Sequence, residues 1–311
     1  MSIETIIPTD EKHWLSLRKQ DVTSTEVAAL FGLSPYMTAF ELWHRKHDNL
    51  EVEFQMNDRV RWGSRLQDSI AVGVAEDHKL TIRKATEYVR DTELFMGASF
   101  DFEITDGPVE ILGPDNMTMG LEIKNVDALA FRDGWIVDGE NIESPPHIEI
   151  QCQQQMMLKG WKRMILAGLI GGNRVVLIKR EPDLKVIDAI KKRIKEFWES
   201  IQSHNAPSPD FQRDSDFIGR LYSYSEPGSV YNADDRVSRL AYAYKQASAE
   251  AKAASDKKDA AKAEILTLVG NAEKVVGETF TVSLGLTGPA LIPAYERKGY
   301  RNFKISWKKE K

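Results

Sequence analysis

Two strand-like runs that carry acidic side chains constrain the fold of this chain more than any other feature. The first run, Gly97 to Phe102, contains Asp101, and the second is Leu121 to Lys124. Successive side chains of a β-strand point to opposite faces, so Glu122 and Lys124 share one face and the apolar residues of that run take the other, buried face. If the two runs are neighbours, two acids and a lysine converge.

An acidic pair beside a lysine suits metal-dependent hydrolysis of phosphodiester bonds. Carboxylates bind a hard divalent cation, the cation acidifies a water molecule and neutralises charge on the phosphate, and the ammonium orients or stabilises the reacting group. Aspartate, a spacer and then Glu-x-Lys is a pattern typical of nucleases. The pattern also arises by chance in chains with 29% charged residues, so a solvated strand face is the alternative interpretation.

Composition bounds the class of protein. With 311 residues, 42% of them hydrophobic, the chain can form one sizeable core and an appendage. The most apolar run, Met164 to Ile170, is far shorter than a membrane-spanning helix, and Met1 to Glu4 lack the pattern of a secretory signal. The single cysteine, Cys152, excludes a disulfide within these residues. We expect a cytoplasmic protein without a membrane segment whose net charge of −5 confines nucleic-acid binding to local positive patches.

Hydrophobic periodicity and turn residues predict an α/β fold. The expected helices cover residues 11–20, 27–31, 38–47, 58–76, 147–159 and 184–203. The expected strands cover residues 80–83, 87–89, 98–104, 120–126, 164–170 and 174–179. Residues 105–119 are expected to form a loop or extended hairpin between the two site strands. This order indicates a central mixed sheet flanked by helices.

The composition changes after residue 205, which divides the chain into an expected core, residues 1–205, and an appendage, residues 206–311. Residues 233–269 are rich in Ala, Lys, Glu and Asp and predict one long helix that packs weakly or pairs with a partner. Residues 274–284 and 302–307 are expected to pair as a small β-hairpin before a basic tail.

Five sequence blocks follow one another in a specific order between residues 14 and 180. They are Trp14-Leu15-Ser16-Leu17-Arg18 with Thr25 to Tyr36, Gly63-Ser64-Arg65-Leu66-Gln67, Ala98-Ser99-Phe100-Asp101, Gly120-Leu121-Glu122-Ile123-Lys124 and Gln151-Cys152-Gln153-Gln154-Gln155-Met156. This series resembles the YqaJ-type viral recombinases, which belong with the lambda exonuclease family among the PD-(D/E)xK nucleases. The resemblance implies a restriction-endonuclease-like core.

The resemblance also implies roles for individual residues. Asp101 and Glu122 would bind the metal together with the backbone carbonyl of Ile123, Lys124 would be the catalytic lysine, and Gln151 would be the motif glutamine on the helix behind the site. One helical turn further on, Gln155 would share the face of Gln151. For either glutamine the alternative is a polar residue that satisfies neighbouring backbone.

At the N-terminal block, Arg18 matches an arginine that contacts the 5′-phosphate of a DNA end, and Thr25 matches a nearby hydroxyl. A guanidinium pairs with phosphate through two parallel hydrogen bonds, which suits arginine to this task. The alternative for Arg18 is a surface salt bridge. The chain departs from the family at Gln67, where a glutamate is usual, so a neutral amide replaces one negative charge and a second metal should bind more weakly.

The function that the resemblance implies is an exonuclease that uses Mg²⁺, or Mn²⁺ as a substitute. It would degrade linear double-stranded DNA from 5′ to 3′ and leave 3′ single strands for phage-type recombination. Expected partners are DNA ends, a single-strand annealing protein and further copies of the chain, in a trimer as in the family. The alternatives are a structure-selective endonuclease and a DNA-end-binding protein whose catalytic site is weakened at Gln67.

Overall fold

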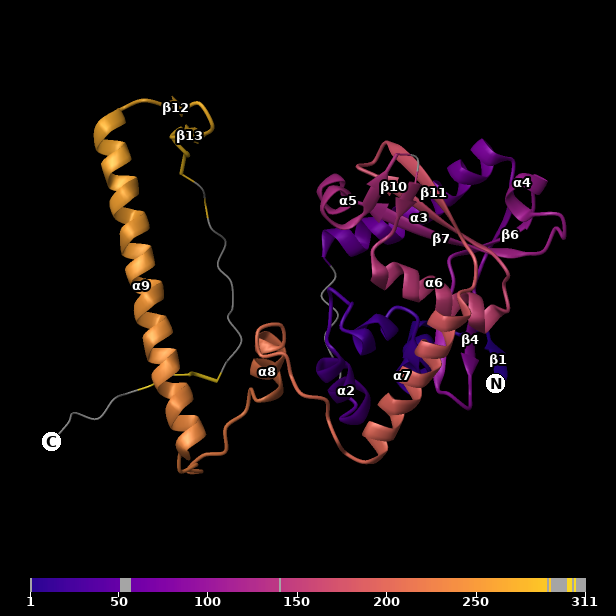
Figure 1. Cartoon of the computed structure of the whole chain (residues 1–311), viewed down its shortest axis with the longest axis horizontal. Helices are drawn as coiled ribbons and strands as arrows, with labels where there is room; N and C mark the ends of the chain where they lie inside the picture. Colours follow the sequence, from indigo (N-terminus) through magenta and orange to yellow (C-terminus); the bar gives the residue numbers. More distant parts are fainter. Residues whose placement is uncertain are drawn as a thin grey trace. The chain divides into compact units, whose positions relative to one another are not determined.

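The computed structural model describes residues 2–50, 57–139, 141–289, 291, 301–303 and 305. The chain divides into two compact units, Met1–Ile218 and Gly219–Lys311 (Figure 1). The end of the first unit is fastened by Asp214, which is buried and accepts a hydrogen bond of 2.5 Å from Thr38 Oγ1.

Short strands and helices alternate along the first unit. In chain order these elements are β1 (Ile3–Ile6), α1 (Glu11–Gln20), β2 (Val22–Thr23), the 3-10 helix η1 (Val27–Phe31), α2 (Ala39–His47), α3 (Asp58–His78), β3 (Thr81–Lys84), β4 (Tyr88–Asp91), β5 (Met96–Ser99), β6 (Phe102–Asp106), α4 (Val109–Leu112), β7 (Met119–Val126), α5 (Ala128–Gly134), β8 (Ile136–Asp138), β9 (Asn141–Glu143), α6 (Pro146–Lys159), β10 (Met164–Ile170), β11 (Arg174–Arg180) and α7 (Leu184–Gln202).

A five-stranded mixed sheet in the order β11-β10-β7-β6-β3 forms the centre of the first unit. Strands β7 and β10 run parallel, with Glu122 beside Leu166, and the other neighbours are antiparallel. The predicted α/β fold with a central mixed sheet is confirmed. A second sheet, in the order β1-β4-β5-β2, and a separate β8-β9 hairpin are not predicted by the sequence pattern.

Helices α3 and α6 supply the apolar layers that cover the five-stranded sheet (Figure 1). Leu121 and Ile123 of β7 pack in one cluster with α3, whereas Met156 of α6 belongs to the other cluster. Each fully buried leucine or isoleucine side chain stabilises such a layer by roughly 1.5–3 kcal/mol. The alternation predicted for β7 is therefore confirmed, and it places Glu122 and Lys124 opposite the α3 side.

The single strand predicted over residues 98–104 is wrong. The structure divides it into β5 and β6, which belong to different sheets: β5 pairs with β4 and β2, and β6 pairs with β3 and β7. Phe100 and Asp101 form the crossing between the two sheets. Asp101 therefore belongs to neither strand, and its carboxylate contacts β7 through the backbone N–H of Ile123.

Residues 105–119, the insert between the two site strands, are predicted to be a loop or extended hairpin. The structure instead contains a short helix there, α4. Leu112 of this helix is fully buried. Arg163 fastens the insert from outside, because its Nη1 donates to the carbonyl oxygen of Leu112 at 2.7 Å and to Asp115 at 2.8 Å. The insert is thus packed against the core.

The second unit contains the end of α8 (Ser215–Leu221), the long helix α9 (Asp235–Val269), and strands β12 (Lys274–Val276) and β13 (Thr281–Ser283). The long helix and a small hairpin are confirmed. The hairpin pairs β12 with β13, and both strands lie within residues 274–284. The prediction that this segment pairs with residues 302–307 is therefore wrong. Residues 304 and 306–307 lie outside the described residues.

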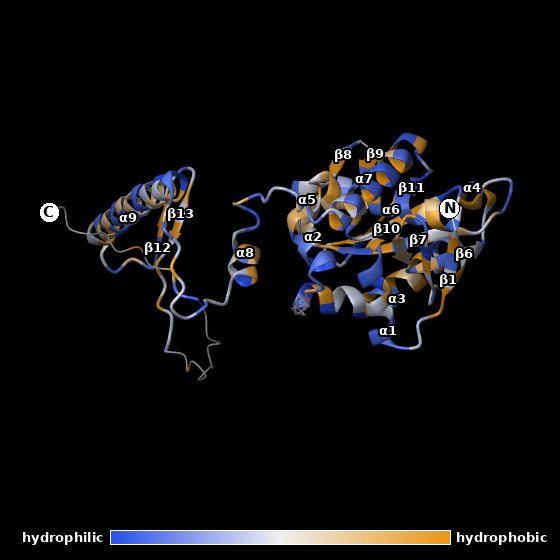
Figure 2. Ribbon diagram, turned by 90° about the horizontal axis from the view of Figure 1, so that it is seen from below, coloured by the Kyte–Doolittle hydropathy of each residue, from blue (hydrophilic) through white to orange (hydrophobic). Residues whose placement is uncertain are grey.

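Helix α9 has no buried residue, and Figure 2 shows hydrophilic and hydrophobic residues mixed along it. Over the part of the chain that the structure describes, no helix combines the length and the apolar composition needed to cross a bilayer.

Candidate active site

Strand β7 places a nearly buried carboxylate beside an ammonium group. Glu122 is 3% exposed, and its Oε1 accepts a hydrogen bond of 2.6 Å from Lys124 Nζ. Burial alone would lower the pKa of Lys124, but the negative charges of Glu122 and Asp101 outweigh burial and raise it above its ordinary value. Lys124 is therefore charged at neutral pH and compensates the buried carboxylate.

Asp101 meets β7 from the crossing between the two sheets. Its Oδ2 accepts a hydrogen bond of 2.8 Å from the backbone N–H of Ile123, and the amide side chain of Gln67 on α3 is near enough to lower the pKa of Asp101. Burial and then the negative charge of Glu122 raise the pKa of Asp101 to about 7, against the opposing effects of Lys124, the Ile123 N–H and Gln67. Two carboxylates and a lysine thus converge at one place.

Two glutamines of α6 complete the surroundings of Glu122. Gln151 Nε2 donates to Glu122 Oε1 at 2.5 Å, and Gln151 Oε1 accepts from Lys124 at 3.2 Å. Gln155 Nε2 donates to Glu122 Oε2 at 2.8 Å and to the carbonyl oxygen of Ser99 at 3.1 Å. Both glutamines therefore contact the site directly. The Oε1 atom of Gln155 is buried without a hydrogen-bond partner among the described residues.

The donor set fits a hard divalent cation that binds through oxygen. A carboxylate has about four lone-pair positions, and the hydrogen bonds from Lys124, Gln151 and Gln155 use three on Glu122. Asp101 contributes a second carboxylate. Within the described residues no group of three or more His, Cys, Asp or Glu side chains could hold a metal, so a cation here would need neutral oxygens as well. Mg²⁺ is commonly bound by one or two carboxylates with water.

A backbone oxygen is available at the same edge of β7. The N–H and C=O groups of one strand residue point to the same side of the strand. Because the Ile123 N–H donates to Asp101, the Ile123 carbonyl also faces that side. Pairing with β6 ends at Leu121 and Phe102, so the ladder between β6 and β7 does not extend to this carbonyl.

A second cluster surrounds Arg18 at the end of α1. Arg18 Nη2 donates to Thr25 Oγ1 at 3.2 Å and to Thr23 Oγ1 at 3.4 Å. The guanidinium also lies 4.6 Å from the centre of the Trp14 ring, a cation–π contact. Arg18 is thus placed by hydroxyl groups and an aromatic face. The surface salt bridge considered from the sequence is absent among the ion pairs of the described residues.

Buried and partly buried hydrogen bonds connect the two clusters. Trp14 Nε1 donates to Ser99 Oγ at 2.8 Å, and the Ser99 carbonyl accepts from Gln155, which also holds Glu122. One residue earlier on α6, Gln154 Nε2 donates to the carbonyl oxygens of Val22 and Gly97, on the two paired strands β2 and β5. The amide side chains of Gln154 and Gln155 therefore connect strands β2 and β5, which lie near Arg18, with Glu122 on β7.

Three residues at these clusters are missed by reasoning from the sequence. Trp14 belongs to the N-terminal block, but nothing in that block indicates that it stacks with Arg18. Ser99 belongs to the block Ala98-Ser99-Phe100-Asp101, but nothing in that block indicates its two hydrogen bonds. The pKa of His147 is lowered by burial and then by the positive charge of Lys124, which places a neutral imidazole near the site. Asp68, beside Gln67, instead pairs with Lys84 at the surface.

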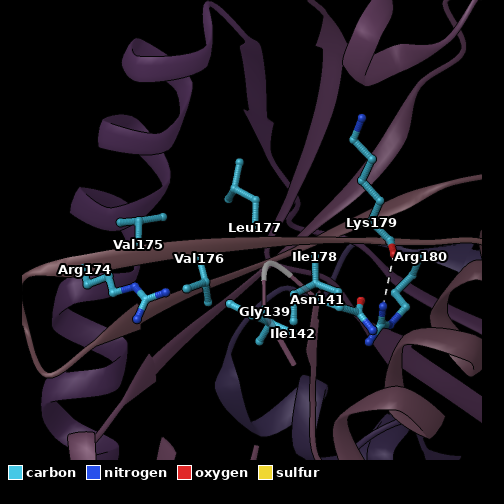
Figure 3. A pocket seen from close by; sticks show the side chains of 10 residues that line it. All are labelled: Gly139, Asn141, Ile142, Arg174, Val175, Val176, Leu177, Ile178, Lys179 and Arg180. Atoms are coloured by element: carbon cyan, nitrogen blue, oxygen red, sulfur yellow. Dashed lines mark hydrogen bonds between the residues drawn. The ribbon is translucent and has the colours of Figure 1, made fainter. Parts of the chain in front are cut away.

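A hollow of ≈ 480 Å³ along β11 is separate from these clusters. Figure 3 shows its lining residues on β11, on β9 and on the β8-β9 connection, and no residue of the two clusters belongs to it. One strand, β10, lies between β11 and β7. The candidate site is therefore defined by converging charged and amide groups.

Part of the sequence is similar to a known protein family. Residues 13–162 match the model of the YqaJ-like viral recombinase domain. The uncharacterized protein YqaJ of Bacillus subtilis (strain 168) is 26% identical over 200 residues, or 63% of this chain and 58% of that protein. The match thus spans less than two thirds of the relative's length. Residues 13–162 are thus similar to a YqaJ-like domain, which confirms the resemblance seen in the sequence.

Solved exonuclease structures are also similar to this chain. An alkaline exonuclease, LHK-Exo from Laribacter hongkongensis, has a TM-score of 0.47 and 16% identity, and the match covers 67% of this chain and 99% of that chain. A phage related exonuclease from Haemophilus somnus 129PT has a TM-score of 0.40 and 13% identity, and the match covers 59% of this chain and 96% of that chain.

We predict that divalent cations bind this site more weakly as the pH falls through about 7. The raised pKa of Asp101 means that below this pH its carboxyl group is neutral and a cation must displace a proton. Calorimetric titration with Mn²⁺ between pH 6 and 8.5 should show falling affinity toward acid and proton release that disappears in Asp101→Asn. An affinity that stays constant over this range would contradict the prediction.

Gln67→Glu should lower the Mg²⁺ concentration that gives half-maximal binding. The new carboxylate would face Asp101, and a cation relieves the repulsion between the two acids. Asp68→Asn changes the charge of the adjacent residue, which faces Lys84, and is the matched control expected to leave the midpoint unchanged. Equal midpoints for Gln67→Glu and the unmodified protein would remove residue 67 from the metal site.

Proposed function

We propose that this protein is a Mg²⁺-dependent exonuclease that degrades linear double-stranded DNA from 5′ to 3′. The observation that carries the proposal is the convergence of Asp101, Glu122 and charged Lys124 at one edge of β7. This convergence lies within the residues that match a YqaJ-like viral recombinase domain. Mn²⁺ is an expected substitute, since it accepts the same oxygen ligands.

In the proposed reaction each residue has a separate task. Asp101, Glu122 and the Ile123 carbonyl would hold the cation, with Gln67 near its outer ligands. When bound, the cation supplies an acidified water and neutralises charge on the phosphate. Lys124 remains protonated and donates hydrogen bonds, so it would stabilise negative charge on the scissile group. Gln151 orients Lys124 and Glu122 and is a positioning residue.

Recognition of the DNA end is assigned to the cluster of Arg18 and Thr25. The Arg18 guanidinium lies next to two hydroxyl groups, and Lys46 donates to the Arg18 carbonyl oxygen at 2.7 Å. Burial alone would raise the pKa of Glu26, but the charges of Lys46 and then Arg18 outweigh it and hold the pKa below its ordinary value. The cluster therefore prealigns the Arg18 guanidinium for a terminal phosphate.

The products would be 3′ single strands, which we propose are passed to a single-strand annealing protein by a homo-oligomeric, trimeric nuclease. A structure-selective endonuclease would use the same chemistry, and covalently closed circular DNA separates the two, since an exonuclease leaves it intact. A DNA-end-binding protein without activity is excluded if nucleotides are released from linear duplex and a chelator abolishes the release.

Lys124→Ala and Glu122→Ala should each reduce nucleotide release by at least about 10²-fold, because transition-state charge stabilisation and metal binding are lost. Binding to duplex ends should change little. Lys192→Ala removes an exposed lysine of α7 and is the matched control expected to retain activity. Near-normal digestion by Glu122→Ala, at equal folded fraction, would show that β7 is not the catalytic strand.

Duplexes with a 5′-phosphate should be digested faster than duplexes with a 5′-hydroxyl, and Arg18→Ala should remove most of that preference. A charge-assisted pair with phosphate is worth about 1.5–3 kcal/mol, or roughly tenfold to a hundredfold in rate at low DNA concentration. Arg18→Lys keeps the positive charge but lacks the planar guanidinium, so this variant should show only part of the preference for a 5′-phosphate. The same preference in Arg18→Ala as in the unmodified protein would exclude Arg18 from end recognition.

A further inference from the structure

Helix α9 is long and has no buried residue within its own unit. It extends from Asp235 to Val269. Leu240, Tyr244 and Leu268 are 60%, 52% and 79% exposed, although they are large and apolar. Packing of an apolar face supplies most of the stability of protein helices, so the exposed apolar residues of α9 indicate a missing partner.

The sequence of α9 carries a heptad repeat along one narrow face. With Val237 taken as position a, the a positions are Val237, Tyr244, Ala251, Lys258 and Ile265, and the d positions are Leu240, Ala247, Ala254, Ala261 and Leu268. Apolar residues that repeat every 3.5 residues form the seam of a coiled coil. Large side chains occupy both ends of this seam and alanines occupy its middle.

The seam is complementary to itself when two copies run antiparallel. In that arrangement a positions pack against d positions, and one alignment matches the whole seam. Its layers are Val237 with Leu268, Leu240 with Ile265, Tyr244 with Ala261, Ala247 with Lys258 and Ala251 with Ala254. Large residues meet at the ends, the tyrosine meets an alanine, and the central alanines allow close approach. Tyr244 also contacts Phe303 of its own chain, with ring centres 5.2 Å apart.

Charges beside the seam select the same alignment. The g positions of antiparallel helices face each other, and here Glu250 faces Lys257 of the second copy, twice by symmetry. A shift of one heptad would place Glu250 against Glu250 or Lys257 against Lys257. A parallel pair in register would place Lys258 against Lys258 and Lys257 against Lys262. Like charges are unfavourable in each of these alternatives.

We propose that α9 pairs with α9 of a second copy of this chain as an antiparallel coiled coil, with Glu250 and Lys257 setting the alignment. The interface has twofold symmetry and therefore joins two chains, independently of how the first unit associates with other copies. The proposal does not depend on the nuclease chemistry, because no residue of the candidate active site belongs to it.

Reversal of the two charges tests the proposal in the full chain. Glu250→Lys or Lys257→Glu converts two attractions into two repulsions, which should weaken self-association measured by sedimentation velocity by about tenfold in Kd. The double variant Glu250→Lys with Lys257→Glu should restore it. Glu264→Lys makes the same charge change at a g position that faces Ala243, and should have little effect.

Two results would overturn the pairing. One is a mass that is the same for the unmodified protein and both single variants at every concentration. The other is a double variant as weak as the single variants, which would mean that the two side chains do not face each other. Helicity by circular dichroism and release of nucleotides from duplex DNA should remain unchanged in all four variants.

Disulfide trapping reports the direction of the helices independently. Ser248 and Ser255 occupy e positions that face each other only between antiparallel copies. Within one helix they are about 10.5 Å apart along the axis, beyond the reach of a disulfide. The variant with both serines changed to cysteine should form a covalent dimer on mild oxidation, whereas each single variant should stay monomeric on a denaturing gel. Absence of the dimer would overturn the antiparallel arrangement.

Discussion

The burial of the Glu122 carboxylate is the constraint on which the rest of the site depends. A carboxylate that is 3% exposed is stable only if its charge is compensated, because transfer of an unpaired ion from water costs several kcal/mol or more. Lys124 supplies the opposite charge, and Gln151 and Gln155 fill further lone pairs. Removal of one partner leaves an incompletely satisfied charge, so these side chains hold each other in place.

Helix α6 extends that constraint through the first unit. Its amide side chains contact Glu122 on β7, the Ser99 carbonyl on β5 and the Val22 carbonyl on β2. Because buried backbone and carboxylate groups must find partners, the helix cannot shift without breaking several hydrogen bonds together. The position of Arg18, next to Trp14 and so to Ser99, is thereby coupled to the position of the acidic pair.

The strand with Glu122 and Lys124 could be predicted from the sequence because alternation has a period of two residues and one face is apolar. The break before Phe102 could not, since residues 98–104 read as one continuous strand and only long-range pairing divides them. The contact of Gln67 with Asp101 was suggested by family spacing, whereas the stacking of Arg18 on Trp14 depends on tertiary placement. The hairpin near residue 280 was misassigned because short strands carry little periodicity.

We propose that Asp101 and Glu122 form one cation site beside Lys124. The most direct measurement is anomalous diffraction from crystals of the Lys124→Ala protein soaked with Mn²⁺ and a short 5′-phosphorylated duplex. A manganese peak is expected between the two carboxylates and next to the Ile123 carbonyl, with a backbone phosphate of the duplex beside it. A peak elsewhere, or density for the duplex end away from Asp101 and Glu122, would contradict it.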